Sequence, residues 1–259
     1  MRRLPRRAAR RLRHLVLAGR FGAIVGVNTT LPMVALTFDD GPHPEFTPRL
    51  IETFAKHGAR ATHFLVGASA AARPDLVNAL VDAGHVVANH GYAHRSLVRL
   101  GPRERYEELA AGRAALLPHV SSLMRPPYGH YDLASARTAR ALGMRCVLWT
   151  KHLRDWEPST AEELQARLEA ALKPGAIILL HEALFTATAD DQQDREPLLA
   201  AIAVVLERLS GKVRFGTVPE LLAQGAPVLR LVEKRGADDF IAAQRAGTVQ
   251  DALGDILTP

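Results

Sequence analysis

The sequence contains a single cysteine, Cys146, among its 259 residues. One cysteine cannot form an intrachain disulfide or supply a multi-cysteine metal site. No apolar run reaches the roughly 20 residues that are needed to cross a bilayer. The chain also lacks a G-x-S-x-G elbow, a Walker A loop and a G-x-G-x-x-G fingerprint. These absences argue against a covalent acyl-enzyme and against nucleotide use.

Acidic residues are absent from the first twenty positions, which hold eight arginines. Of the 33 basic residues, 25 remain for the rest of the chain against 27 acidic ones, so the formal net charge of +6 arises in this segment. We expect a basic N-terminal arm over residues 1–30. It would be a disordered tail, a cleaved secretory signal, or an arm attracted to anionic lipid or nucleic acid.

Two features of the arm narrow these alternatives. No aromatic residue alternates with the arginines, so base stacking and a nucleic-acid partner are not expected, whereas peripheral contact with an anionic membrane is. Arg20 interrupts the apolar run that a secretory signal would need. A cytoplasmic or membrane-peripheral location is therefore favoured over secretion, and the oligomeric state is left open.

A regular alternation of strand and helix patterns begins at Met33. Short apolar runs alternate with amphipathic helical spacing, which predicts parallel strands covered by helices. We predict a distorted (β/α)7 barrel over residues 31–225, with an open doubly wound sheet as the alternative, and a helical C-terminal extension over 226–259. The seven predicted strands are 33–38, 61–66, 85–89, 122–124, 144–149, 176–180 and 213–215.

Polar residues follow the predicted strands where these end, and the strands themselves have almost none. In such folds the active site lies at the carboxyl ends of the strands. Five of the seven strand ends carry groups that could bind a metal, move a proton or hold an anion, which indicates an enzyme. These segments are Asp39-Asp40-Gly41-Pro42, His90-Gly91-Tyr92-Ala93-His94, Arg125-Pro126-Pro127-Tyr128-Gly129, Asp155-Trp156 and His181-Glu182.

The histidine pair and the aspartate pair together indicate a metal site. His90 and His94 can converge on one ion, and a catalytic zinc site uses three nitrogen or oxygen ligands plus water. Either Asp39 or Asp40 would complete the set. Adjacent carboxylates repel, so a cation on one and a guanidinium on the other would let the second stay ionised as a base. Taken alone, the two histidines could be ordinary surface residues, and Asp-Asp-Gly-Pro could be an ordinary turn that ends a strand.

In this order the five motifs resemble those of the polysaccharide deacetylases, the NodB-homology family or carbohydrate esterase family 4. The resemblance covers about residues 33–225, and TFDDGP at 37–42 with RPPYG at 125–129 is highly specific. It implies a distorted seven-stranded barrel and a divalent metal, usually zinc, although cobalt, nickel or iron would fit the same ligands. It also implies removal of N-acetyl groups from N-acetylglucosamine units of chitooligosaccharide, peptidoglycan or exopolysaccharide.

The resemblance also assigns roles to individual residues. Asp39 would be the general base, held by Arg125, and would take a proton from metal-activated water. His181 would be the general acid, oriented by Asp155. The metal ligands would be Asp40, His90 and His94.

The remaining assignments concern the substrate. The backbone N–H of Tyr128 would help to bind the oxyanion, and Trp156 and Leu179 would line the pocket for the acetyl methyl group. Gly91 stands where the family pattern has a hydroxyl residue that would brace the histidine loop, and His152 stands where an acid is usual. The alternatives are an O-acetyl polysaccharide esterase and a non-catalytic carbohydrate-binding barrel.

Overall fold

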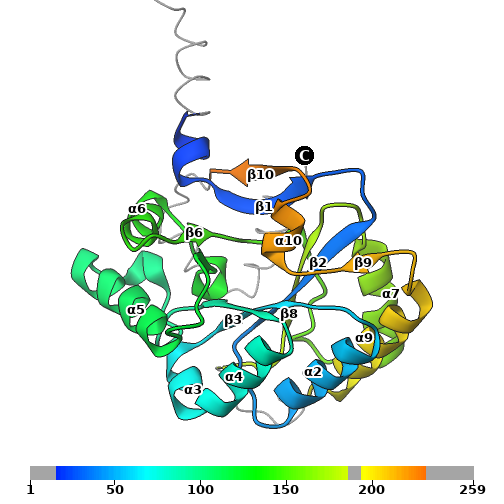
Figure 1. The fold of residues 1–259 in the computed structure, drawn as a ribbon. Coiled ribbons are helices and arrows are strands. Elements are labelled where there is room, and N and C mark those ends of the chain that lie inside the picture. The colour runs from blue at the N-terminus through cyan, green and yellow to red at the C-terminus, as the bar shows by residue number, and fades with distance from the viewer. Residues whose placement is uncertain (1–15, 186–193, 232–259) are drawn as a thin grey trace, which may run out of the picture.

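A computed structural model describes residues 16–185 and 194–231, and its core is one curled parallel sheet (Figure 1). The strand order is β6-β5-β4-β3-β2-β8-β7, and β9 pairs with β2 beside this path. All seven predicted strands are present, β7 is an eighth, and the predicted distorted barrel is confirmed. The strands are β2 Met33–Asp39, β3 Thr62–Leu65, β4 Val86–Asn89, β5 Leu123–Met124, β6 Arg145–Cys146, β7 Lys151–His152, β8 Ile177–His181 and β9 Arg214–Phe215.

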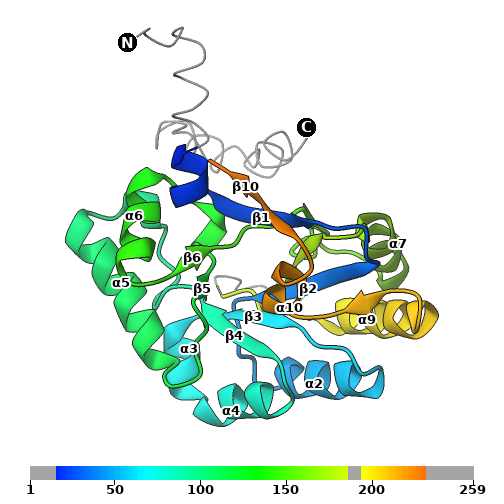
Figure 2. The ribbon, with the colours of Figure 1, turned by 45° about the horizontal axis from the view of Figure 1, so that its top comes forward.

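Helices surround this sheet on its outer side, as Figures 1 and 2 show together. Each turns an apolar face inwards, as alternating strand and helix patterns require. Among the described residues, no helix combines the length and the apolar character needed to cross a bilayer. The helices are α2 Phe46–Lys56, α3 Gly67–Ala72, α4 Pro74–Asp82, α5 Pro102–Ala115, α6 Leu133–Ala141, α7 Ala161–Ala171, α9 Glu196–Leu209 and α10 Val218–Leu222, with 3-10 turns η1 Leu97–Arg99 and η2 Pro127–Gly129.

Strand β2 lies at the centre of the sheet, and all seven of its residues are buried. Phe38 of β2 packs edge-on against Phe54 of α2, with ring centroids 5.9 Å apart, and both side chains are fully buried. Burying one such side chain contributes about 1.5–3 kcal/mol to folding. The strand end that carries Asp39 and Asp40 is thus fixed by a buried, well-packed strand.

Two strands that the sequence did not reveal, β1 (Ala23–Asn28) and β10 (Ala226–Arg230), pair antiparallel with each other. On the edge of β1 that does not face β10, isolated bridges join Ile24 to Val147, just after β6, and Gly26 to Ala176, just before β8. Strand β1 therefore lies across the gap between the two ends of the curled sheet, and β10 covers its free edge (Figure 2).

This pairing corrects two expectations. The predicted helical extension is wrong for residues 226–230, because β1 offers an edge with which this short segment forms a strand. The predicted arm over 1–30 includes β1, which belongs to the folded part. The boundaries of the three segments otherwise stay a prediction, since residues 1–15 and 232–259 lie outside those that the structure describes.

The predicted strand at 144–149 is shorter than expected, because β6 ends at Cys146. After it the backbone takes other partners. Leu148 donates its N–H to the carbonyl oxygen of Ile24 at 2.8 Å, and the carbonyls of Val147 and Leu148 accept from the side chain of Arg125. An apolar run alone does not show where such side-chain bonds replace the strand ladder.

Candidate active site

The structure brings Asp40, His90 and His94 together at the carboxyl ends of β2 and β4. Asp40 Oδ1 lies 3.1 Å from His94 Nε2 and 3.4 Å from His90 Nε2. One ligand atom from each residue falls within 4.8 Å of the other two, and all three residues are buried. Of the two aspartates that the sequence left open, Asp40 is therefore the one that faces both imidazoles.

This cluster fits a divalent cation. The buried Asp40 Oδ1 accepts no hydrogen bond, and His90 Nδ1 donates to the carbonyl oxygen of Arg125 at 2.8 Å. That bond leaves the lone pair of His90 Nε2 facing the carboxylate, which is the tautomer of a metal ligand. Burial would raise the pKa of Asp40, but the two neighbouring imidazoles hold it well below its usual range.

The backbone at two residues of this cluster is unusual. Asp40 has a φ of 71° and His94 a φ of 53°, a region that residues other than glycine rarely adopt. Such conformations cost about 1–3 kcal/mol each and persist where the surroundings enforce them. The N–H of Phe185 also donates to Asp40 Oδ2 at 3.0 Å, so one carboxylate oxygen is held while the other faces the histidines.

The histidine loop is braced by two residues that the sequence analysis missed. Glu108 of α5 accepts through Oε1 from the N–H groups of Tyr92 at 2.9 Å and Ala93 at 2.7 Å. The side chain of Asn89 accepts from the N–H of Gly91 at 2.7 Å. These hydrogen bonds brace the histidine loop, which is the role expected of the hydroxyl residue that Gly91 replaces. Glu108 lies on the buried face of α5, and an acid at such a position was the feature of the sequence that could have indicated this role.

Arg125 is fully buried and holds Asp39 in place. Its Nη1 donates to Asp39 Oδ1 at 2.7 Å, while Nε and Nη2 donate to the carbonyls of Val147 at 3.2 Å and Leu148 at 3.0 Å. The guanidinium also lies 4.1 Å from the ring centre of Phe64. Asp39 Oδ2 is left beside the cluster of Asp40, His90 and His94, 3.7 Å from His90 Nε2.

His181 ends β8 in register with Asp39 on the neighbouring strand β2. Its Nδ1 lies 3.1 Å from Asp155 Oδ1, and its backbone N–H donates to Asp155 Oδ2 at 2.8 Å. Arg195, which the sequence analysis did not single out, donates to the carbonyl oxygen of Asp155 at 2.7 Å. Burial would lower the pKa of His181, but the Asp155 carboxylate raises it to about 9.

Three further predicted residues lie around these groups. Tyr128, with a φ of 61°, places its ring 4.5 Å from that of His94. Trp156 stands edge-on to His181, with ring centroids 5.5 Å apart. Leu179 is buried in the hydrophobic cluster against which Trp156 packs. All the predicted site residues therefore lie at one end of the barrel.

The charges of the basic residues near this site are only partly compensated. Arg154 pairs with Glu157 at 2.9 Å. Burial lowers the pKa of His152, which packs against Trp156 with ring centroids 5.2 Å apart. Lys151 of the same segment is exposed, so its charge is open to solvent.

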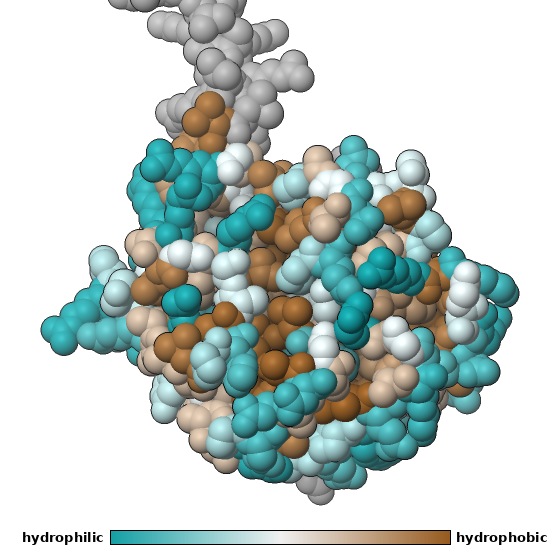
Figure 3. Space-filling view, viewed as in Figure 1, coloured by the Kyte–Doolittle hydropathy of each residue, from teal (hydrophilic) through white to brown (hydrophobic). Residues whose placement is uncertain are grey.

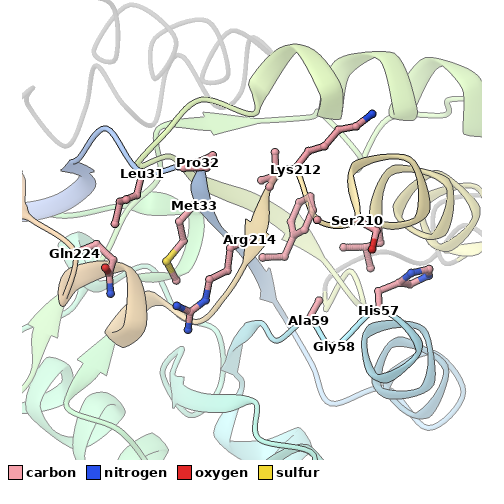
Figure 4. Close-up of a pocket in the computed structure, with 14 residues that line it drawn as sticks. Leu31, Pro32, Met33, His57, Gly58, Ala59, Ser210, Lys212, Arg214 and Gln224 are labelled. Carbon is pink, nitrogen blue, oxygen red and sulfur yellow. The ribbon is translucent and has the colours of Figure 1, made fainter.

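A cavity of about 440 Å³ lies at the opposite end of the barrel (Figure 4). Met33, which begins β2, lines it, whereas Asp39 ends that strand, roughly 20 Å away for a seven-residue strand. Figure 3 shows hydrophobic residues near the middle of the same face of the molecule, with hydrophilic ones around them. His57, Lys212 and Arg214 line the cavity, but no strand-end motif residue does, so the candidate chemistry lies elsewhere.

Sequence relatives agree with this geometry. A family profile described as polysaccharide deacetylase matches residues 26–147. The chain is 39% identical to a chitooligosaccharide deacetylase of Sinorhizobium fredii over 158 residues, covering 60% of this chain and 74% of that protein. It is 32% identical to a peptidoglycan-N-acetylglucosamine deacetylase of Bacillus cereus over 195 residues, covering 73% of this chain and 88% of that protein.

Solved structures share the fold. The Bc1960 peptidoglycan N-acetylglucosamine deacetylase superposes with a TM-score of 0.72 at 25% identity, over 82% of this chain and 98% of that one. A family 4 carbohydrate esterase of Streptomyces lividans superposes with a TM-score of 0.63 at 28% identity, over 80% of this chain and 100% of that one. BA3943 of Bacillus anthracis, described as a family 4 pseudoenzyme, superposes with a TM-score of 0.67 at 25% identity, over 83% of this chain and 74% of that one. The chain belongs to the polysaccharide deacetylases, the NodB-homology family of carbohydrate esterase family 4.

Proposed function

We propose that this chain is a metal-dependent deacetylase that hydrolyses the acetyl amide of N-acetylglucosamine units in an oligo- or polysaccharide. The observation that carries the proposal is the meeting of Asp40, His90 and His94 beside a second carboxylate, that of Asp39. The named activities of the relatives from Sinorhizobium fredii and Bacillus cereus support it.

The proposed ligands are Asp40, His90 and His94, and zinc suits their two imidazoles and one carboxylate. Cobalt, nickel or iron would suit the same set. A divalent cation bound there would polarise the acetyl carbonyl and lower the pKa of a water molecule.

Asp39 is the proposed general base. Arg125 occupies its Oδ1, so Oδ2 is the oxygen that accepts the proton from the attacking water. The buried guanidinium of Arg125 places a cation 2.7 Å from this carboxylate and fixes its orientation. Proton transfer of this kind contributes about 10²–10⁴-fold to a rate.

His181 is the proposed general acid. In the imidazolium, Nδ1–H donates to Asp155, and Nε2–H is the proton that passes to the sugar nitrogen as the C–N bond breaks. The raised pKa of His181 keeps this proton present at neutral pH. The products are acetate and a free amine on the sugar.

The oxyanion and the acetyl methyl group need two further contacts. The N–H of Tyr128 would donate to the developing oxyanion, since its left-handed backbone redirects this group relative to an extended chain. Trp156 and Leu179 would form the apolar wall against the methyl group, since both belong to the same hydrophobic cluster.

Two other functions remain as alternatives. The same groups could hydrolyse an O-acetyl ester, because water attack and oxyanion stabilisation are common to both reactions. The second alternative is a non-catalytic sugar-binding barrel, and the lack of catalysis, though not the binding of sugar, has a precedent in the pseudoenzyme BA3943. The retention of the ligand set, the held base and the His181–Asp155 pair together favours an enzyme, since burying these charges serves no purpose in a mere binding surface.

The test is acetate release from N-acetylated chitooligosaccharides, peptidoglycan and an O-acetylated xylan. We expect release from an N-acetylated substrate, abolished by a chelator and restored by zinc. Release from xylan alone would favour the esterase. Full turnover after chelation would refute the metal mechanism.

For the arm, we propose peripheral contact with an anionic membrane and hence a cytoplasmic or membrane-peripheral location. Deletion of residues 2–15 is the appropriate test, because a deletion to residue 30 would also remove β1. Arginine near an anionic surface contributes about 1 kcal/mol per residue. The full chain should sediment with anionic vesicles but not with zwitterionic ones, and the deletion should lose this binding while releasing acetate from a soluble oligomer.

A further inference from the structure

A second cluster of buried polar side chains lies directly behind the candidate site. Glu182 follows His181, and its carboxylate Oε1 lies 2.9 Å from Nδ1 of His63 on β3. Both side chains are completely buried. Burying an acid and an imidazole without a role would be costly, and neither residue takes part in the proposed chemistry.

Glu182 lies against the turn that carries both aspartates. Its backbone N–H donates to the carbonyl oxygen of Asp39 at 3.2 Å. Its carboxylate fills the space beside Gly41, where a Cβ atom would overlap Oε1 and Cδ of Glu182. Residue 41 must therefore be glycine for the carboxylate to approach the backbone next to Asp40.

The other carboxylate oxygen reaches the far end of the same loop. Thr47, in the first turn of α2, donates its hydroxyl to Glu182 Oε2. The same hydroxyl accepts from the N–H of His43 at 2.8 Å. Glu182 therefore contacts the loop 40–46 where it leaves β2 and where it enters α2.

The hydrogen bonds also fix the number of protons in the cluster. His85 Nδ1 accepts from the N–H of Ala61 at 3.2 Å, so His63 Nε2, also 3.2 Å from it, must be the donor in their contact. One further proton then lies between His63 Nδ1 and Glu182, and the pair is neutral overall wherever this proton resides. A glutamine at 182 could donate to a neutral His63 and still accept from Thr47.

We infer that Glu182 and His63 are a positioning pair that holds loop 40–46 in the conformation in which Asp40 faces His90 and His94. This inference rests on the proposed metal site and goes beyond its ligands. Asp40 needs such support because its backbone is in the left-handed region. Loss of a group that orients a metal ligand costs about 10–100-fold in metal affinity.

The test measures zinc affinity of the purified, metal-free full chain by competition with a chromogenic chelator. Glu182→Ala should bind zinc about 10–100-fold more weakly than the unmodified chain. Glu182→Gln keeps both hydrogen bonds and should stay within about threefold. A folded Glu182→Ala with unchanged zinc affinity would overturn the inference.

A milder pair of variants keeps the test decisive if Glu182→Ala does not fold. Thr47 and Thr62 are both fully buried, but the Thr62 hydroxyl accepts from the N–H of Val218, away from loop 40–46. Thr47→Val should weaken zinc binding several-fold and Thr62→Val should not. Equal affinities in the two variants would refute the positioning role. Absence of zinc binding by the unmodified chain would instead refute the proposed function on which it rests.

Discussion

Replacing Arg125 by methionine tests how strongly the proposed base depends on its buried partner. The substitution keeps much of the side-chain volume but leaves the Asp39 carboxylate buried without a cation. It also removes the donors to the carbonyls of Val147 and Leu148. Removal of one member of a buried ion pair costs about 3–5 kcal/mol. Since domains are stable by about 5–15 kcal/mol, Arg125→Met should lose a large fraction of its free energy of unfolding.

A double-mutant cycle separates the ion pair from simple loss of packing. Asp39→Asn alone leaves the Arg125 guanidinium buried and unpaired, and the double variant leaves neither charge. The free-energy cost of the double variant should therefore fall short of the sum of the two single costs by at least about 2 kcal/mol. Arg105→Met is the matched control, because Arg105 is also buried and donates to the carbonyls of Leu97 and Leu100.

The assay is urea unfolding of the metal-free chain, followed by far-ultraviolet circular dichroism. The Arg105→Met variant should be destabilised additively with Asp39→Asn, because Arg105 contacts backbone oxygens rather than that carboxylate. Two results would refute the reasoning. One is a cost below about 1 kcal/mol for Arg125→Met, and the other is additivity between Arg125→Met and Asp39→Asn.

Three further predictions concern activity and metal binding. Asp39→Asn should lower kcat by at least about 100-fold while zinc still binds, because Asp39 is a base and not a ligand; loss of zinc in a titration would contradict this. His181 donates its proton only when cationic, so kcat should fall as pH rises through its pKa of about 9. Asp155→Asn removes the carboxylate that raises this pKa and should move the alkaline limb of the kcat profile to lower pH; an unmoved limb would exclude His181 as the acid. Glu108→Ala frees the N–H groups of the histidine loop and should weaken zinc affinity about 10-fold or more, whereas tight binding would show that the loop holds itself.

The site could be predicted from the sequence because its residues adjoin strands that are easy to recognise. A buried parallel strand has an apolar signature, and the fold places whatever follows it at the same end of the barrel. The residue pattern alone did not decide between Asp39 and Asp40 as the ligand, and only the family resemblance assigned Asp40 to this role. That choice depends on the backbone of Asp40, whose φ of 71° turns its carboxylate towards the histidines.

The supporting residues were not predictable in the same way. Glu108 lies on a helix and acts on a loop that precedes it in sequence, and Glu182 pairs with His63 across the sheet. Contacts of this kind depend on how helices, strands and loops pack against one another. The hydrophobic periodicity of the sequence does not contain this information. Strands β1 and β10 were not predicted for a related reason, since each pairs with a partner about 200 residues away in the sequence.

The pairing of β1 with β10 has a consequence for biosynthesis. Strand β1 is made early and closes the gap in the curled sheet, but its partner β10 is the last strand of the described chain. Until residues 226–230 have been made and released from the ribosome, the outer edge of β1 lacks this partner, although β2 to β9 all precede β10 in the chain. Pairing between such distant segments is slow because a long stretch of chain must first be ordered. Covering of the outer edge of β1 by β10 is therefore a late event in folding, and a stalled or truncated product would expose that edge to other nascent chains.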